Sequence, residues 1–142
     1  MMTAVDVFKL GLHIKQIQQR KQLAVDAGLA PLGTTMSQWI VLRNIAAHPG
    51  KSAHELAQVT FQTDQSFGAL VSRLVDRGLV ERAQGPGRRL LHRLTDDGAA
   101  LLKRCDPLVE RALRDQFGNL DDTELGQLHA LLERIVARPP SS

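Results

Sequence analysis

The sequence predicts a mainly α-helical protein with one small β-hairpin, and three observations lead to this fold class. Apolar residues recur at three- and four-residue spacing along most of the chain, as they do on one face of a helix. Signals that start and stop helices divide this pattern into separate segments. Two short apolar runs, 79–83 and 90–94, flank a Gly-Pro-Gly sequence, which is typical of two strands joined by a turn.

Two helices are expected in the first part of the chain. The first covers about residues 5–27, and Gly28 and Pro31 are expected to end it because both residue types disfavour a helix interior. Either Thr35 or Ser37 is expected to cap the second helix, which stops at a His-Pro-Gly sequence.

The middle of the chain carries the most specific motif. Ser52 and Glu55 form an S-x-x-E capping box, which starts a short helix that ends near Val59. Thr63 caps the next helix, and Gly78 stops it as a left-handed C-cap residue. The expected hairpin follows directly. Two helices, a tight break and a hairpin in this order predict a winged helix-turn-helix, a unit that docks on double-stranded DNA.

Two more helices are expected after the hairpin. Either Thr95 or Asp96 caps a long helix over about residues 97–117, in which Pro107 predicts a kink or a break. The last helix begins at residues 120–121 and continues with an apolar face of leucines and one isoleucine.

The first helix and the last two carry wide apolar stripes that the small winged unit is not large enough to cover. An exposed stripe of this size predicts a partner surface, and a second copy of the chain is the simplest partner. An intramolecular bundle of the three helices is the alternative. The predicted organisation is an N-terminal dimerisation helix and loop (1–34), a winged helix-turn-helix domain (35–95), C-terminal dimerisation helices (96–138) and a tail (139–142).

Composition agrees with a folded domain. Hydrophobic residues make up 43% of the chain, and no apolar run approaches the ~20 residues of a membrane span. The N-terminus lacks the features of a signal peptide. The single Cys105 has no intrachain disulfide partner, and as an exposed thiol it would suit a reducing cytoplasm.

Charge is unevenly distributed along the chain. Residues 1–50 and 51–95 each carry a net charge of +3, whereas residues 96–142 carry −3. The positive charge therefore accompanies the hairpin and its helices, where phosphates would be met. A solvated basic face is the plain alternative.

The helix that begins at Thr63 is expected to enter the major groove. Its apolar face carries phenylalanine, leucine and valine, so small and polar residues lie on the opposite face. Gln65 suits an adenine, Arg73 a guanine or a phosphate, and Ala69 a thymine methyl group. Gly68 allows close approach to DNA, or else it only relieves internal packing.

Further DNA contacts are expected from the preceding helix and from the hairpin tip. Ser52 suits a phosphate, whereas His54 is expected to be an ordinary exposed histidine. At least one of Arg88 and Arg89 is expected to project from the tip into a minor groove, unless the tip is simply solvated. The expected DNA-binding residues are Ser52, Thr63, Gln65, Ser66, Gly68, Ala69, Ser72, Arg73, Arg88 and Arg89.

The segments SAHELAQ, LVSRLVDRGLVER and GRRLLHRLTDDG, with the spacing between them, resemble MarR-family transcriptional regulators. The resemblance covers nearly the whole chain and implies a cytoplasmic homodimer, in a bacterium or archaeon, that binds a pseudo-palindromic operator at the nucleoid and usually represses nearby genes. Arg88 matches the arginine of the family that enters the minor groove. Pro86 stands where the family commonly has Asp, so a tip held rigid by Pro86 is expected instead of an Asp–Arg arrangement.

The resemblance also implies a ligand pocket between the dimerisation helices and the winged domain, often for phenolic or other aromatic acids. An apolar cavity with one cationic group would suit an aromatic carboxylate. Plain structural roles are the alternative, with Trp39 and Met36 in the core and Arg43 in a surface pair. The expected ligand-binding residues are His13, Gln16, Arg20, Met36, Trp39 and Arg43.

Two other functions remain open at this point. One is a winged-helix DNA-binding protein without a small-molecule effector, and the other is a redox sensor that acts through the thiol of Cys105. No H-E-x-x-H, G-x-S-x-G or phosphate-loop motif occurs in the sequence. We therefore expect no enzyme activity, no cofactor and no metal.

Overall fold

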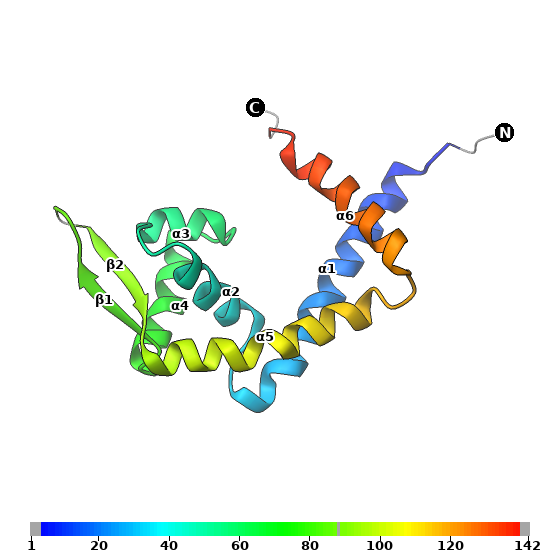
Figure 1. Ribbon diagram of the computed structural model, residues 1–142. Helices are drawn as coiled ribbons and strands as arrows, with labels where there is room; N and C mark the ends of the chain where they lie inside the picture. The colour runs from blue at the N-terminus through cyan, green and yellow to red at the C-terminus, as the bar shows by residue number, and fades with distance from the viewer. Residues whose placement is uncertain (1–3, 88, 140–142) are drawn as a thin grey trace.

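The computed structural model describes residues 4–87 and 89–139 and confirms the predicted fold class. Figure 1 shows α3, α4 and the hairpin at one end of the molecule. Helix α5 leads from them to α1 and α6 at the other end. No helix in the described residues is long and apolar enough to cross a membrane. The elements in order are α1 (Val7–Leu29), η1 (Ala30–Leu32), α2 (Met36–Ala47), α3 (Ala53–Val59), α4 (Asp64–Asp76), β1 (Val80–Gln84), β2 (Leu90–Leu94), α5 (Asp96–Gln116) and α6 (Asp122–Ala137).

The helices begin where the sequence places their caps. Thr35, rather than Ser37, caps α2 by accepting a hydrogen bond from the backbone N–H of Gln38. Thr95, rather than Asp96, caps α5 in the same way. The capping box that starts α3 is complete in both directions, and these bonds satisfy backbone donors that a helix N-terminus would otherwise leave unpaired.

One expected helix end differs from the structure. Helix α1 runs past Gly28 to Leu29, and Pro31 lies inside the short helix η1 that follows. Leu29 is completely buried, so packing of the last turn outweighs the low helix propensity of glycine. The chain turns only at Gly33, whose φ of 68° is left-handed.

Pro107 does not break α5, which is one helix from Asp96 to Gln116. Figure 1 shows α5 changing direction near its middle, so of the two expected outcomes, a kink or a break, the kink is the one found. Cys105 and Val109 are buried on either side of the proline, and their burial holds both halves of the helix against α1 and α2.

The hairpin is antiparallel and places Val80 opposite Leu94 and Arg82 opposite His92. Gly78, with φ 74°, turns the chain from α4 into β1 as predicted. Gly98 lies in the first turn of α5 directly against the backbone of Leu79, where any Cβ would overlap the Leu79 carbonyl group. This close approach fixes the angle between the hairpin and α5.

Two buried clusters hold the chain together. The first is the core of the winged domain and joins α2, α3, α4 and the start of the hairpin, with Phe67 and Leu42 among its fully buried members. The second joins α1, α2 and α5 through Val25, Leu29, Met36, Cys105 and Val109. Leu101 packs against both clusters and connects them.

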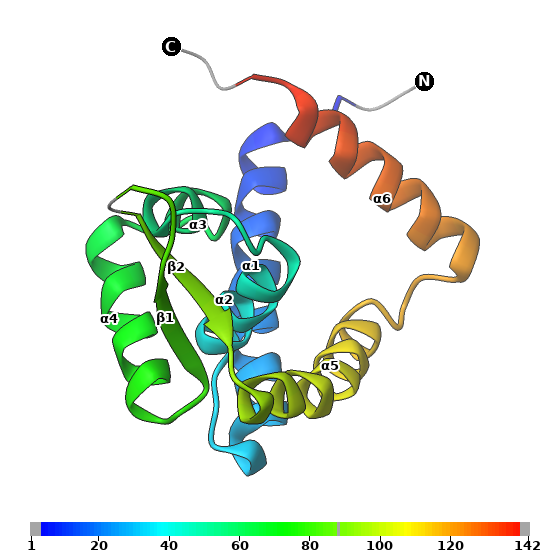
Figure 2. The ribbon, with the colours of Figure 1, turned by 60° about the vertical axis from the view of Figure 1, so that its left-hand side comes forward.

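The two ends of the chain are packed very differently. No residue of α6 is buried, and α6 has no extensive packing contact with another described element. Figure 2 shows α6 standing apart from the winged domain. Along α1, the apolar residues before Val25 are exposed. The expected alternative of an intramolecular three-helix bundle is therefore wrong for the described residues.

Candidate nucleic-acid interface and ligand grooves

Helix α4 presents the face that the sequence predicts. Phe67, Val71 and Leu74 are buried in the winged core. The opposite face, with Gln65, Gly68, Ala69, Ser72 and Arg73, is exposed. A Cβ added to Gly68 would meet no atom within 4 Å, so internal packing does not require a glycine at this position. The absence of a side chain lowers the outer surface of α4, as close approach to a base edge requires.

Two of the predicted DNA-binding residues, Ser52 and Thr63, also cap helices with their hydroxyl groups. The Oγ of Ser52 accepts a hydrogen bond of 3.2 Å from the backbone N–H of Glu55. The Oγ1 of Thr63 accepts one of 3.0 Å from the backbone N–H of Ser66. Each hydroxyl keeps its own hydrogen to donate, so capping and phosphate binding are compatible.

Two contacts around the interface residues are not predicted by the sequence. His54 is exposed, as expected, but its Nδ1 lies 2.9 Å from a carboxylate oxygen of Asp64 and so links the starts of α3 and α4. Arg82 in β1 donates to the Oγ of Ser72, at 3.2 Å. Helix α4 is therefore attached to α3 through Asp64 and to β1 through Ser72.

In this structure Arg89 folds back onto α3. Its Nη2 donates to the carboxylate of Glu55 at 2.8 Å and to the backbone carbonyl of Gly50 at 3.3 Å. Hydrogen bonds from Ser52 lower the pKa of Glu55, and the charge of Arg89 lowers it further. The turn itself is closed by a hydrogen bond of 2.8 Å from Gly85 to Arg89. Arg88, the arginine that the family resemblance singles out, lies outside the described residues.

The six expected ligand-binding residues do not share one cavity. Trp39 donates from Nε1 to Asp106 at 2.9 Å, and Arg43 reaches the same carboxylate oxygen at 3.5 Å. The guanidinium carbon of Arg43 also lies 5.6 Å from the centre of the Trp39 ring. Trp39 and Arg43 therefore contact each other and Asp106, and these contacts join α2 to α5. His13 and Gln16 are exposed on α1.

Met36 lines a groove between α1, α2 and α4, which we call the α1–α4 groove. Its volume is about 830 Å³. Its walls combine apolar side chains with two cations, Lys21 and Arg73. Four of its lining residues, Thr63, Ser66, Ala69 and Arg73, are also expected DNA contacts. The full lining is Gln18, Lys21, Met36, Ser37, Ile40, Val59, Thr60, Phe61, Gln62, Thr63, Ser66, Ala69, Leu70 and Arg73.

Phe61 gives the α1–α4 groove an unusual wall. Its side chain is 95% exposed, and its φ of 57° is left-handed although it is not glycine. Both the exposed aromatic ring and the left-handed backbone cost free energy in the isolated chain. The left-handed turn ends α3 and is closed by backbone hydrogen bonds from Phe61 to Gln58 at 3.2 Å and from Gln62 to Ala57 at 2.9 Å.

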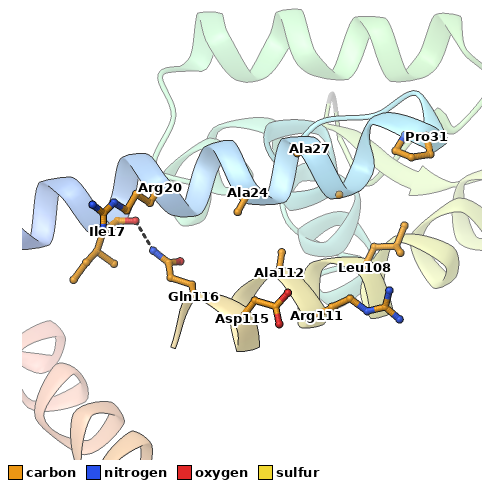
Figure 3. A pocket seen from close by; sticks show the side chains of 11 residues that line it. Ile17, Arg20, Ala24, Ala27, Pro31, Leu108, Arg111, Ala112, Asp115 and Gln116 are labelled. Carbon is orange, nitrogen blue, oxygen red and sulfur yellow. Dashed lines mark hydrogen bonds between the residues drawn. The ribbon is translucent and has the colours of Figure 1, made fainter. Parts of the chain in front are cut away.

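Arg20 lines a second groove, between α1 and α5, with a volume of about 680 Å³. Figure 3 shows Ala24 and Ala112 facing each other across it. Gln116 spans one end, where its Nε2 donates to the backbone carbonyl of Ile17 at 2.8 Å. Arg111 adds a second cation to the lining. The groove continues the exposed apolar surface of α1.

Cys105 is not an exposed thiol. It is completely buried in the cluster between α1, α2 and α5. Burial, and then the charge of Asp106, raise the pKa of the thiol. A redox sensor needs an accessible cysteine with a lowered pKa, so the structure contradicts the alternative of sensing through Cys105. Its burial could have been predicted from the sequence, because Leu101, Cys105 and Val109 are four residues apart and therefore lie on one face of the helix.

Comparisons with known proteins agree with this architecture. The MarR family model matches residues 32–90. The HTH-type transcriptional repressor Rv2887 of Mycobacterium tuberculosis is 30% identical over 136 residues, which cover 94% of this chain and 98% of the relative. The multiple antibiotic resistance protein MarR of Escherichia coli is 31% identical over 134 residues, covering 92% of this chain and 93% of the relative.

Solved structures of the same two relatives are similar along most of the chain. Rv2887 in complex with p-aminosalicylic acid has a TM-score of 0.77 at 30% identity, covering 90% of this chain and 98% of that one. A mutant of Escherichia coli MarR in complex with operator DNA has a TM-score of 0.84 at 29% identity, covering 92% and 95%. The identity over nearly full length, with the same arrangement of elements, shows that this chain belongs to the MarR family.

Proposed function

We propose that this protein is a homodimeric transcriptional repressor that binds a pseudo-palindromic operator and is released from it by a small aromatic acid. It would act in the cytoplasm, on chromosomal DNA. The observation that carries the proposal is the exposed face of α4, on which Gly68 and Ala69 lie between polar side chains over a fully buried core. Family membership supports the same function, since relatives are solved with operator DNA and with salicylic acid.

Binding to DNA would follow from the geometry of the winged domain. The small residues of α4 would let the helix approach the major groove, and Gln65 and Arg73 would contact base edges or phosphates. The capping hydroxyls of Ser52 and Thr63 would donate to phosphates on either side. Operator binding would exchange the Glu55 carboxylate, which Arg89 contacts in this structure, for a phosphate.

Release by an effector would follow from the residues that the α1–α4 groove shares with the DNA-binding face. A ligand seated there would cover Thr63, Ser66, Ala69 and Arg73 and would therefore compete with DNA for them. Lys21 and Arg73 offer positive charge to a carboxylate. The apolar wall, which includes Phe61, offers contact to an aromatic ring.

A second copy of the chain would cover the exposed ends. Helix α6 and the first half of α1 display apolar side chains without burying them, and a two-fold axis would bring the same surfaces of two chains together. The two α4 helices would then lie about one turn of DNA apart, or roughly 34 Å. The dimer therefore explains why an operator with two half-sites is expected.

Selection of bound duplexes from a random pool tests this function. The purified chain is expected to enrich an inverted repeat, and salicylic acid is expected to lower its affinity for that duplex. If no sequence is enriched, the regulator proposal is wrong. If a repeat is enriched but neither salicylic nor p-aminosalicylic acid changes the affinity, the alternative without an effector of this class is favoured.

A further inference from the structure

A histidine and an aspartate form a pair on the side of the winged domain that is proposed to face DNA. His54 in α3 and Asp64 in α4 are both exposed, with 66% and 68% of their side chains accessible. Neither is an expected DNA contact, but Asp64 lies between Thr63 and Gln65 in the sequence, and His54 follows Ser52 by two positions. The pair therefore lies where the two helices of a helix-turn-helix would meet DNA.

The contact between these two side chains fixes which ring nitrogen carries a hydrogen. Nδ1 of His54 lies 2.9 Å and 3.0 Å from the two carboxylate oxygens of Asp64. An ionised carboxylate can only accept hydrogen bonds, so Nδ1 must donate. In the neutral imidazole one nitrogen carries a hydrogen, and Nε2 is then left with a lone pair. The carboxylate of Asp64 therefore selects the neutral tautomer in which Nε2 is an acceptor.

This neutral tautomer is unsuited to a phosphate. A phosphate oxygen of DNA also only accepts hydrogen bonds, so the lone pair of Nε2 would repel it. The imidazolium form carries a hydrogen on both nitrogens and can donate to Asp64 and to a phosphate at the same time. Its positive charge also offsets the carboxylate of Asp64, which by itself repels phosphates. A contact between His54 and DNA therefore requires one proton from the solvent.

The other charged groups near His54 come from its own helix, from the loop before it and from the hairpin. Glu55 follows His54 directly, and Arg89 of the hairpin donates to the Glu55 carboxylate at 2.8 Å. Lys51 lies just before α3. Among the charged groups that the structure describes here, Asp64 is the one within hydrogen-bond distance of the imidazole. It is therefore Asp64 that sets the tautomer of the ring.

We propose that His54 is a contact to a DNA phosphate, and that Asp64 makes this contact depend on protonation. When a phosphate meets Nε2, the ring takes up one proton from the solvent and donates from both nitrogens. The bound form holds a proton that the free form holds only at lower pH, so DNA affinity falls as the pH rises through neutrality. The inference rests on the proposed function, which supplies double-stranded DNA as the ligand.

Fluorescence anisotropy of the full chain with a DNA duplex, at about pH 6 and about pH 8, tests the proposal. A duplex of any sequence serves, because phosphate contacts do not depend on sequence. The affinity of the parent chain should be about tenfold or more lower at the higher pH. His54→Gln keeps a donor group but takes up no proton, so its affinity should change far less.

The outcomes separate this inference from the proposed function. Equal pH dependence in the parent chain and in His54→Gln would overturn the role of His54 and leave the regulator proposal intact. A chain that binds no duplex at either pH would contradict the proposed function and this inference with it.

Asp64→Asn distinguishes a proton-linked contact from a merely structural link between α3 and α4. An amide both donates and accepts, so it no longer holds the neutral ring in one tautomer. Nε2 can then donate without an added proton, and affinity at the higher pH should rise about threefold or more. Weaker binding of Asp64→Asn at both pH values would show that the pair only joins the two helices, and would contradict the proposal.

His129→Gln is the matched control for both variants. His129 also lies 3.0 Å from a carboxylate, that of Glu133, but on α6 outside the winged domain. Its replacement should leave the affinity and the pH dependence of the parent chain unchanged. Loss of the pH dependence in His129→Gln would overturn the assignment to His54.

Discussion

The winged domain and the terminal helices differ in how far their apolar side chains are buried. In the winged domain, Phe67, Leu42 and Leu74 are almost completely buried within a single chain. In α6 and the first half of α1, residues of similar type lie exposed; Phe8 is 84% exposed and Ile135 is 66% exposed. The comparison teaches that one region contains its own core, while the other leaves its apolar residues exposed, as we propose, for a second copy to cover.

The largest expected effect is on the core of the winged domain. Phe67→Ala should lower the free energy of unfolding by about 3–5 kcal/mol, because it removes a fully buried ring from beneath α4. Urea unfolding followed by circular dichroism measures this loss. Phe61→Ala changes the same residue type at an exposed position and should shift stability by about 0.5 kcal/mol or less. Similar losses in both variants would contradict the assigned core.

The next effect separates the terminal helices from the winged domain. Ile135→Asp places a charge in the exposed stripe of α6 and should weaken dimerisation by about 100-fold or more, because the carboxylate would be desolvated in the interface. Sedimentation velocity measures the change. Ala130→Asp, on the opposite face of α6, should leave the dimer intact. If Ile135→Asp leaves the dimer intact, the dimer interface does not include this face of α6.

A smaller effect is expected at the DNA-binding face. Arg73→Ala should weaken operator binding by about 1–3 kcal/mol, and it should reduce the salt slope by about 1 if Arg73 contacts a phosphate. Fluorescence anisotropy at several salt concentrations measures both quantities. Arg114→Ala, which removes an exposed arginine paired with Glu110 on α5, serves as the control. Equal losses in the two variants would argue against a role for α4.

The smallest effect concerns the exposed turn of the winged domain. Phe61→Gly should raise the free energy of unfolding by about 0.5–1 kcal/mol, because glycine adopts the left-handed backbone without strain. The same change should weaken salicylic acid binding, since it removes an aromatic wall of the α1–α4 groove. Thermal unfolding and calorimetric titration give the two numbers. A variant that is less stable, or that binds salicylic acid unchanged, would show that Phe61 has another role.

Local signals in the sequence predict much of this fold. The capping residues Thr35, Ser52 and Thr63 act through hydrogen bonds to the next few residues, so their pattern is visible without tertiary structure. The exposed face of α4 follows from helical periodicity in the same way. By contrast, Gly28 and Pro107 lie inside helices because burial of neighbouring side chains outweighs their local preferences.

Contacts between distant segments are the part that the sequence does not predict. Arg89 meets Glu55, and Trp39 meets Asp106, only because separate helices and strands are packed together. The expected ligand-binding residues lie in different places for the same reason. Arg20 lines the groove between α1 and α5, whereas Met36 lines the α1–α4 groove. Lys21 and Phe61 were missed for this reason, because neither residue is marked by a local motif.

The number of chains on one operator duplex tests the central claim most directly. Native mass spectrometry of the full chain with its selected duplex should show two copies per duplex at every protein concentration at which a complex forms, because the terminal helices join the two winged domains before they reach DNA. A complex with one 15.6 kDa chain that forms with the same affinity on an isolated half-site would contradict the account.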